Sequence, residues 1–280
     1  MTVFAGQGDA ARSMALLWRR QTPGNAAGPA RTAPGPKPGL TVDAIVDAAI
    51  AVADAHGLGG LSMRAVADRL GRTAMALYTY VPGKGELLDL MHDRAHAELP
   101  AEHDLDQGWR AALTSWAEHL LAFYLRHPWA LQVSQARSAL GPDEQAVLES
   151  LLRILHDTGL PARVVRRVVG VMFQVVRGTA QIIAESRIAT TATGVSDQEW
   201  WSTRSALLHE LAPDFAERFP MTVWLGSDGV VAAPPGDSTP YLEREADETF
   251  SVGLAIVLDG IEATLARESA DRWAAGRPDG

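Results

Sequence analysis

The chain of 280 residues contains no cysteine. This absence excludes disulfide bonds, thiolate metal sites and a cysteine nucleophile, and it agrees with a protein of the reducing cytoplasm. The sequence also has no run of 18 or more apolar residues, and the short apolar stretch from Met14 to Trp18 ends at two arginines without a cleavage-type pattern of small residues. We therefore expect a cytoplasmic protein with neither a membrane span nor a signal peptide.

Motifs that carry catalysis are absent as well. The sequence has no GxSxG and no Walker loop, and the GxGxxA spacing from Gly6 to Ala11 follows no strand-like segment. His92 and His96 are four residues apart with His103 nearby, but the glutamate of an HExxH zinc motif is missing. We interpret these histidines as polar surface or pocket lining. We expect no catalytic residue, metal or cofactor, and an enzyme built on a helical bundle is the least favoured alternative.

The net charge of −9 at first argues against nucleic-acid binding, which depends on lysine and arginine. The distribution is uneven, however. Residues 1–84 have a balance of +4, whereas residues 85–280 have a balance of −13. A mildly basic end joined to an acidic body permits contact with phosphates at that end only.

The segment between Gln21 and Gly39 is rich in helix breakers, since nine of its nineteen residues are proline or glycine. It also lacks the apolar content to pack against a core. We expect residues 1–40 to form a flexible arm. An alternative is that Arg31 and Lys37 bring this arm along DNA, as basic arms do in a minor groove.

Helical spacing begins at residue 41. Apolar residues recur every three or four positions, which predicts a helix that Thr41 caps and Gly57 ends. Ser62 is placed to cap a second helix, which Gly71 ends. A third, short helix is expected to begin near Thr73, and a fourth covers about residues 84–99.

The remainder of the chain has helical periodicity and no confident strand-like segment. Its apolar stripes predict helices up to a final one that contains Phe250, Leu254 and Leu258, and a loop rich in proline and glycine runs from Pro220 to Pro240. The expected fold is all-α, with nine or ten helices. We expect a three-helix helix-turn-helix DNA-binding domain over 41–99 and a helical ligand-binding and dimerisation domain over 100–280.

Two short helices joined by a tight glycine turn form the unit that places a recognition helix in the DNA major groove. The small side chains of Ala74, Ala76 and Thr79 permit close approach to the groove. Tyr78, Tyr80 and Lys84 are suited to contacts with phosphates or sugars. Arg64 is the candidate for a two-pronged contact with guanine, because its fork matches the two acceptors of that base.

The sequence LSMRAVADRLGRTAMALYTYVPGKGELLDLM, residues 61–91, resembles the DNA-binding domain of the tetracycline-repressor (TetR) family. GPDE at 141–144 and FSVGLAIVLDGIEATL at 250–265 resemble the C-terminal domain of the branch that includes the tetracycline repressor. The resemblance implies a set of residues on the DNA side: Ser62, Arg64, Thr73, Ala74, Met75, Ala76, Tyr78, Thr79, Tyr80 and Lys84.

A ligand cavity is expected in the C-terminal domain, with a wall of aromatic and polar residues. In the tetracycline repressor, a histidine just before the segment equivalent to GPDE helps to bind the metal of the drug. Gln135 to Ser138 occupy that neighbourhood here, so we do not expect a magnesium–tetracycline ligand. The competing interpretations are core packing for the aromatics and a subunit interface for the polar stripe. The candidates are Trp109, Trp116, Phe123, Trp129, Gln135, Gln174, Arg177 and Gln181.

The sequence thus predicts a transcriptional repressor that binds a palindromic operator in double-stranded DNA as a homodimer and is released by a small-molecule effector. The resemblance implies that helices over 161–189 and 241–268 form the dimer interface, and four glycines in them permit close approach. The alternative is a DNA-binding or protein-interaction module without an inducer. The glycines are Gly170, Gly178, Gly253 and Gly260.

Overall fold

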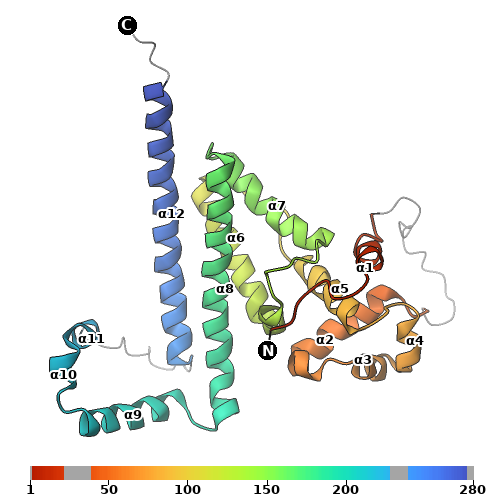
Figure 1. The fold of residues 1–280 in the computed structure, drawn as a ribbon, viewed down its shortest axis with the longest axis horizontal. Coiled ribbons are helices and arrows are strands. Elements are labelled where there is room, and N and C mark those ends of the chain that lie inside the picture. The colour runs from red at the N-terminus through yellow and green to blue at the C-terminus, as the bar shows by residue number, and fades with distance from the viewer. Residues whose placement is uncertain (1, 22–38, 228–238, 276–280) are drawn as a thin grey trace. The chain divides into compact units, whose positions relative to one another are not determined.

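The computed structural model describes residues 2–21, 39–227 and 239–275, with side chains up to residue 270, and these residues contain helices and no strand (Figure 1). The expected all-α fold is confirmed. The helices are α1 (Ala10–Leu17), α2 (Val42–Gly60), α3 (Met63–Leu70), α4 (Ala74–Tyr78), α5 (Lys84–His96), α6 (Gly108–Arg126), the 3-10 helix η1 (Pro128–Gln132), α7 (Pro142–His156), α8 (Ala162–Thr193), α9 (Asp197–Leu211), α10 (Phe215–Arg218), α11 (Pro220–Leu225) and α12 (Tyr241–Ala275).

The chain forms two compact units. The first contains residues up to Ala180 together with those from Leu254 onward, and the second contains Gln181–Gly253. The boundary between these two compact units does not coincide with the domain boundary expected between residues 99 and 100. Helix α5 packs on α7 as well as on α2, so residues on both sides of the expected boundary belong to one unit. Those domain boundaries stay a prediction.

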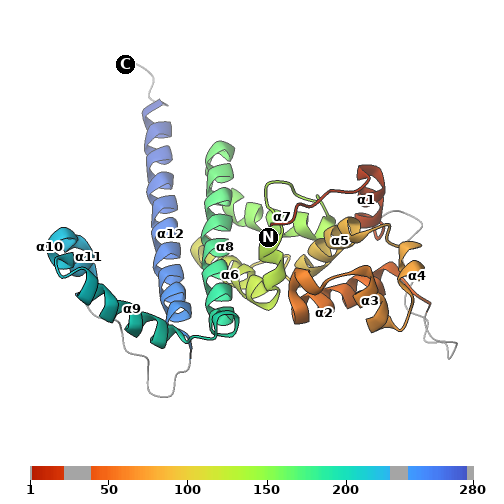
Figure 2. The same ribbon diagram turned by 60° about the horizontal axis from the view of Figure 1, so that its bottom comes forward.

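Helices α2 to α5 enclose a small core of their own (Figure 2). The Thr41 hydroxyl accepts the N–H of Ala44 at 3.1 Å and so caps α2, as predicted. Gly57 interrupts the helical backbone with a φ of +64°, a region that glycine enters without steric cost. The core of this bundle is fully buried apolar side chains, among them Ile45, Val66, Leu77, Val81 and Leu87.

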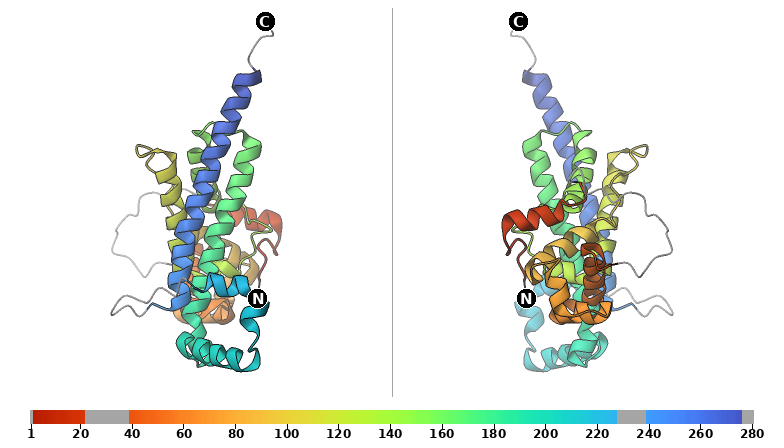
Figure 3. Two further views of the ribbon diagram at one scale, coloured as in Figure 1. Left: turned by 90° about the vertical axis from the view of Figure 1, so that its left-hand side faces the viewer. Right: turned by 90° about the vertical axis from the view of Figure 1, so that its right-hand side faces the viewer.

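Helix α6 is the centre of the larger bundle in the first unit. Its face with Leu113, Trp116 and Leu120 is buried and packs on α7. At the other side, Arg110 donates to Asp259 at 2.6 Å and to Glu262 at 2.9 Å on α12. Figure 3 shows α8 and α12 as long, uninterrupted helices.

The second unit consists of the C-terminal part of α8, helices α9 to α11 and the first turns of α12. Arg187 and Glu243 join its two long helices through a two-pronged ion pair, with the shortest distance at 2.6 Å. The prediction of a loop from Pro220 to Pro240 was wrong for its first residues, because Pro220–Leu225 is helical. Proline is well tolerated in the first turn of a helix, where its missing N–H has no partner to lose. Residues 228–238 of that loop lie outside the described residues.

The prediction of a flexible arm over residues 1–40 was also wrong for part of its length. Residues 10–17 form α1, which Asp9 caps through the N–H of Arg12 at 2.8 Å. Ala5 and Leu17 are buried. The glycine and proline cluster that suggested flexibility lies after this helix, and residues 22–38, with Arg31 and Lys37, lie outside the described residues.

Two helices, Ala162–Thr193 and the Tyr241–Ala270 part of α12, are long and apolar enough to cross a membrane by length and composition alone. Core helices of soluble proteins meet the same criterion. Both helices here form ion pairs with other helices, such as Arg163 with Glu268 at 2.7 Å. Length and composition therefore do not decide the environment of these helices.

Candidate functional site

Helices α3 and α4 meet through a tight turn. Gly71 adopts the left-handed conformation with a φ of +63°, and the N–H of Arg72 bonds back to the carbonyl of Ala67 at 2.9 Å. The hydroxyl of Ser62 caps α3 at 3.1 Å, and that of Thr73 caps α4 at 3.4 Å. The turn thus starts a second helix almost immediately after the first, as the helix-turn-helix motif requires.

The outer face of α4 and its flanks is strongly exposed. Leu77 is completely buried and anchors α4, whereas Met75 is 76% exposed and the two tyrosines Tyr78 and Tyr80 are exposed as well. On α3, the Arg64 side chain is 88% exposed and has only a loose contact with Asp68 at 3.9 Å. An anchored short helix with an exposed small-residue and tyrosine face is able to enter a groove about as wide as one helix.

Three of the predicted DNA-side residues already have structural partners. Ser62 and Thr73 use their hydroxyls as caps for the first turns of α3 and α4. Lys84 starts α5, and its Nζ lies 3.5 Å from the carbonyl oxygen of Leu58. That contact is long for a hydrogen bond, so the ammonium is held only weakly.

The first unit also contains a cavity of about 490 Å³. Helices α5, α6, α7 and α8 form its walls with the loop over 133–140, and the N-terminal segment contributes one residue. Most of the wall is apolar. The lining residues are Ala5, His92, His96, Tyr124, Val133, Ser134, Gln135, Arg137, Ser138, Ala139, Leu140, Glu144, Gln145, Val147, Leu148, Val169, Gly170, Phe173 and Gln174.

The lining includes two charged residues, Arg137 and Glu144, and its two histidines and its tyrosine are held in their neutral forms. Burial lowers the pKa of His92 well below its usual value, and His96 and the Arg177 guanidinium lower it further. Burial likewise lowers the pKa of His96 and raises that of Tyr124, so both rings are neutral near pH 7. The Tyr124 hydroxyl accepts a bond from the Gln135 amide at 3.2 Å. Among the described residues, His92 Nδ1 is buried and has no hydrogen-bond partner.

Two family models match this chain. Residues 45–91 match the bacterial regulatory proteins of the tetR family, and residues 100–265 match the tetracyclin repressor-like C-terminal domain. The chain is also 39% identical over 267 residues to the HTH-type transcriptional repressor DrrR1 of Streptomyces coeruleorubidus, over 95% of this chain and 90% of that protein. The chain belongs to the TetR family. The first unit therefore contains a TetR-type helix-turn-helix, and the chain is a transcriptional regulator.

Solved structures of TetR proteins have the same fold. The TetR-family protein ActR of Streptomyces coelicolor in complex with actinorhodin has a TM-score of 0.62 and 26% identity, over 81% of this chain and 99% of that one. Apo ActR has a TM-score of 0.61 and 25% identity, with the same coverage.

The cavity includes only two of the eight residues predicted for a ligand site, Gln135 and Gln174. Trp116, Phe123 and Trp129 are at most 2% exposed and belong to the core, which was the competing interpretation. Gln181 lies in the second unit and pairs with Glu185 at 2.5 Å.

The two remaining candidates act elsewhere in this TetR-family protein. Arg177 donates to the carbonyl oxygens of Leu131 and Val133, so it fixes the start of the loop that forms the cavity rim. Trp109 is half-buried beside the guanidinium of Arg110, which lies 5.6 Å from its ring. Neither lines the cavity. His103 lies against His119, at 5.6 Å between ring centroids, and away from the His92–His96 pair.

Helix α5 is fastened to α7 at the segment GPDE of this TetR-family chain. Asp93 Oδ1 accepts the N–H groups of Asp143 at 2.9 Å and Glu144 at 3.0 Å, which caps the start of α7. Burial raises the pKa of Asp93 to about 6, against the lowering effect of these donors. A Cβ on Gly141 would lie 2.1 Å from Asp93 Oδ1 and 2.8 Å from its Cβ. Only glycine lets the two helices approach so closely.

We expect Gly141→Ala to destabilise the protein by about 1–3 kcal/mol, because the new methyl group forces Asp93 away from the start of α7. Gly170→Ala is the matched control, since a Cβ at this helical position meets nothing within 4 Å and alanine favours a helix. Urea unfolding followed by fluorescence measures both. Equal stability of the two variants would show that the α5–α7 contact tolerates a wider spacing.

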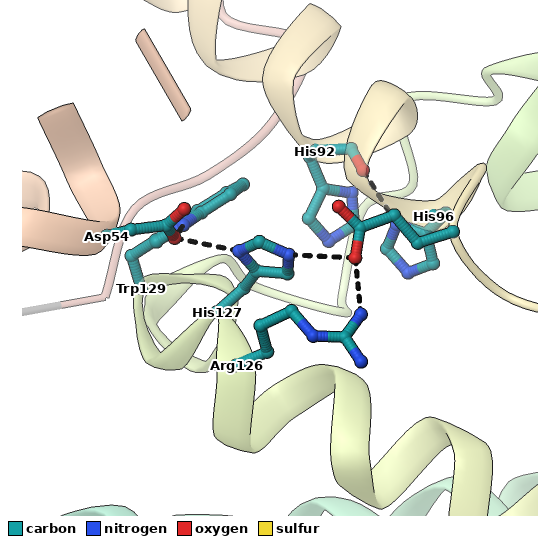
Figure 4. A network of polar contacts seen from close by, with 7 residues as sticks. Asp54, His92, His96, Arg126, His127 and Trp129 are labelled. Atoms are coloured by element: carbon teal, nitrogen blue, oxygen red, sulfur yellow. Dashed lines mark hydrogen bonds and ion pairs between the residues drawn. The ribbon is translucent and has the colours of Figure 1, made fainter. Parts of the chain in front are cut away.

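A second joint connects the DNA-binding helices to α6 (Figure 4). The ring of His127 is buried between two carboxylates, with Nδ1 2.7 Å from Asp54 and Nε2 3.2 Å from Glu98. Each ring nitrogen thus lies within hydrogen-bond distance of a carboxylate oxygen on a different element. Trp129 also donates to Asp54, at 2.7 Å. The network spans α2, the end of α5 and the α6–η1 corner.

Sequence reasoning left several functional candidates out. Phe173, Tyr124 and the rim residues 133–140 other than Gln135 come from separate elements, and no short-range spacing connects them. Asp93 was missed because its partners lie fifty residues further along. The available signal was the four-residue spacing of His92 and His96, which was interpreted as surface or pocket lining. The second of those alternatives agrees with the structure.

Proposed function

We propose that this regulator is a repressor that binds a palindromic operator as a homodimer and leaves it when a small molecule enters the cavity. One observation carries this proposal. Helix α5 begins with Lys84 beside the DNA-binding unit and carries His92 and His96 in the cavity wall. A single helix, which rises about 1.5 Å per residue, thus connects the two sites.

The DNA part of the proposal rests on α3 and α4. These two helices and the residues that flank them carry nine of the ten predicted contact residues, and the tenth, Lys84, starts α5. A two-fold dimer presents two such surfaces to successive turns of DNA. Most acidic residues of the chain lie outside residues 1–84, so the part that contains the DNA-binding helices has a net positive charge. The repressor name of DrrR1 supports the direction of regulation.

The chemistry of the cavity favours a largely apolar, uncharged effector. Its interior polar groups are neutral imidazole, phenol and amide groups, which recognise hydroxyl or carbonyl oxygens by hydrogen bonds. Of the two charged lining residues, Glu144 is already engaged by the Ser138 hydroxyl at 2.7 Å and the Leu140 N–H at 3.1 Å. The actinorhodin complex of ActR supports ligand binding by this fold.

Release from DNA requires only a modest coupling energy. A 100-fold loss of operator affinity corresponds to about 2.7 kcal/mol of differential binding between the two states. The Asp93 contact with α7 and the His127 network are the joints through which a shift of the cavity walls would move α5 and α2. Each joint consists of charge-assisted hydrogen bonds, which change steeply with distance.

Two variants, one of an arginine and one of a lysine, test the operator part of the proposal. We expect Arg64→Ala to reduce discrimination between operator and random DNA by about 1–3 kcal/mol, and Lys84→Ala to weaken both duplexes alike. Fluorescence anisotropy with the upstream region of the chain's own gene, mapped first by footprinting, measures both. Equal losses on specific and random duplexes for both variants would contradict the assignment of base contacts to Arg64.

The effector part is tested by a screen for quenching of tryptophan fluorescence, followed by operator release with each hit. Trp116 lies edge-on to Phe173 of the cavity wall, with 5.3 Å between ring centroids, so its emission reports on occupancy. Compounds that bind tightly yet leave operator affinity unchanged across a broad panel would favour a constitutive DNA-binding protein.

Dimerisation through α8 and α12 gives a further prediction. Val171 on α8 is 40% exposed and Ile256 on α12 is 65% exposed, although both helices are rich in apolar residues. We expect Ile256→Asp to raise the dimer dissociation constant at least about 10-fold, because it places a charge in an apolar contact. Analytical ultracentrifugation measures this, with Ile256→Val as the control. A wild-type monomer at micromolar concentration would overturn the dimer proposal.

A further inference from the structure

The N-terminal segment, residues 2–21, contributes Ala5 to the cavity wall, and it lies outside both matched family models, which cover residues 45–91 and 100–265. It follows the edge of the first unit from the cavity rim to α1 (Figure 1). Ala5 is 4% exposed and lines the cavity, and Leu17 is 3% exposed. We call residues 2–21 the N-terminal strap.

The strap is bonded to the cavity rim at two places. Near its start, the Val3 N–H donates to the carbonyl of Gln132 and the Ser134 N–H donates to the carbonyl of Val3, both at 2.8 Å. Near its end, the indole N–H of Trp18 donates to the carbonyl of Leu140 at 3.0 Å. Leu140 has a φ of +58°, a costly conformation for leucine, so surrounding contacts must maintain it.

The same strap is bonded to the DNA-binding helices. The N–H of Gly6 donates to both carboxylate oxygens of Asp89 on α5, at 3.0 and 3.2 Å. Arg19 and Arg20 both pair with Asp43 in the first turn of α2, Arg20 at 2.9 Å. Burial raises the pKa of Asp43, but the two arginines outweigh it and hold the pKa below its usual value. The carboxylate is therefore charged wherever the protein is folded near neutral pH.

From these contacts we infer that the N-terminal strap is a working part of the effector site: it closes the cavity at Ala5 and ties the cavity rim to the start of α2. A ligand that displaces the rim at Ser134 or Leu140 must stretch these hydrogen bonds or move the strap with it. Moving the strap pulls on Asp43 and so on the helix that supports α3 and α4. This inference rests on the proposed effector function, and it adds a route through Asp43 on α2 to the contacts that α5 makes with the cavity and with Gly6.

The inference predicts that loosening the strap at one end accelerates hydrogen exchange of the backbone amides at the other end. We expect Asp43→Asn, which removes the ion pairs at α2, to accelerate hydrogen exchange of the Ser134 amide at least about 5-fold. Trp18→Phe, which removes the bond to Leu140, should accelerate exchange in the first turn of α2 by a similar factor. The control is Arg12→Ala on α1, whose side chain has no hydrogen bond or ion pair to the described residues. Hydrogen exchange with mass spectrometry on the full chain measures all three.

A second measurement uses the absence of cysteine in this chain. A single thiol introduced by Ala5→Cys should react slowly with a disulfide reagent, and Asp43→Asn in the same chain should speed the reaction at least about 5-fold by loosening the strap. If each substitution alters exchange only beside its own site and the thiol rate stays unchanged, the strap does not connect rim and helix. Neither measurement uses operator or effector, so the inference can fail while the repressor proposal stands, and the reverse also holds.

Discussion

Replacing Gly170 by phenylalanine is expected to abolish the response to effector while operator affinity stays within about 2-fold of wild type. Gly170 lies in the cavity wall on α8, and a Cβ there meets nothing within 4 Å, so the first side-chain carbon fits without a clash. A phenyl ring then occupies volume that the effector needs. We expect the dissociation constant of any compound found by the fluorescence screen to rise at least about 100-fold, since overlap with a filled site is costly.

Gly170→Ala is the control for this effect, because a methyl group removes little of the 490 Å³ cavity. Calorimetric binding of the screened compound and anisotropy with labelled operator are measured on the same preparations, and sedimentation checks that the dimer persists. Unchanged effector binding in Gly170→Phe would place the effector site elsewhere in the chain.

Met75→Glu is expected to reduce operator affinity at least about 100-fold with no loss of stability. Met75 is 76% exposed on α4, so the fold does not depend on it, but the proposed geometry points this face at the major groove. A carboxylate there meets the negative potential of two phosphate backbones. Met75→Gln keeps the size without the charge and should lose far less affinity. Anisotropy at several salt concentrations measures both, and operator binding by Met75→Glu near the wild-type level would remove α4 from the interface.

The DNA-binding unit could be predicted from the sequence because its determinants are local. The hydroxyls of Thr41, Ser62 and Thr73 each cap a helix by accepting the N–H three residues further along. Gly71 adopts the left-handed conformation in the turn between α3 and α4. Caps and turns act over three or four residues, a range that one sequence displays directly. The roles of Arg64 and its neighbours on DNA remain predictions.

The cavity could not be predicted in the same way. Tryptophans at helical spacing suggested a ligand site, yet Trp116 and Trp129 fill the core, since large aromatics gain most when fully buried. Gln135 and Gln174 were identified and do line the cavity. Its other polar groups come from α5, α6, α7 and the loop over 133–140, which approach one another only when the bundle forms.

By itself the sequence determined the helices, their caps and the helix-turn-helix, because periodic burial and end signals are written in neighbouring residues. Only the tertiary structure decided which side chains share the cavity, why Gly141 must lack a side chain beside Asp93, and that residues 2–21 pack as a strap instead of extending as an arm. The physical reason is the same in each case. Contacts such as Gly6 with Asp89 or Trp18 with Leu140 join residues more than eighty positions apart, and their free energy depends on positions in space that no local pattern specifies.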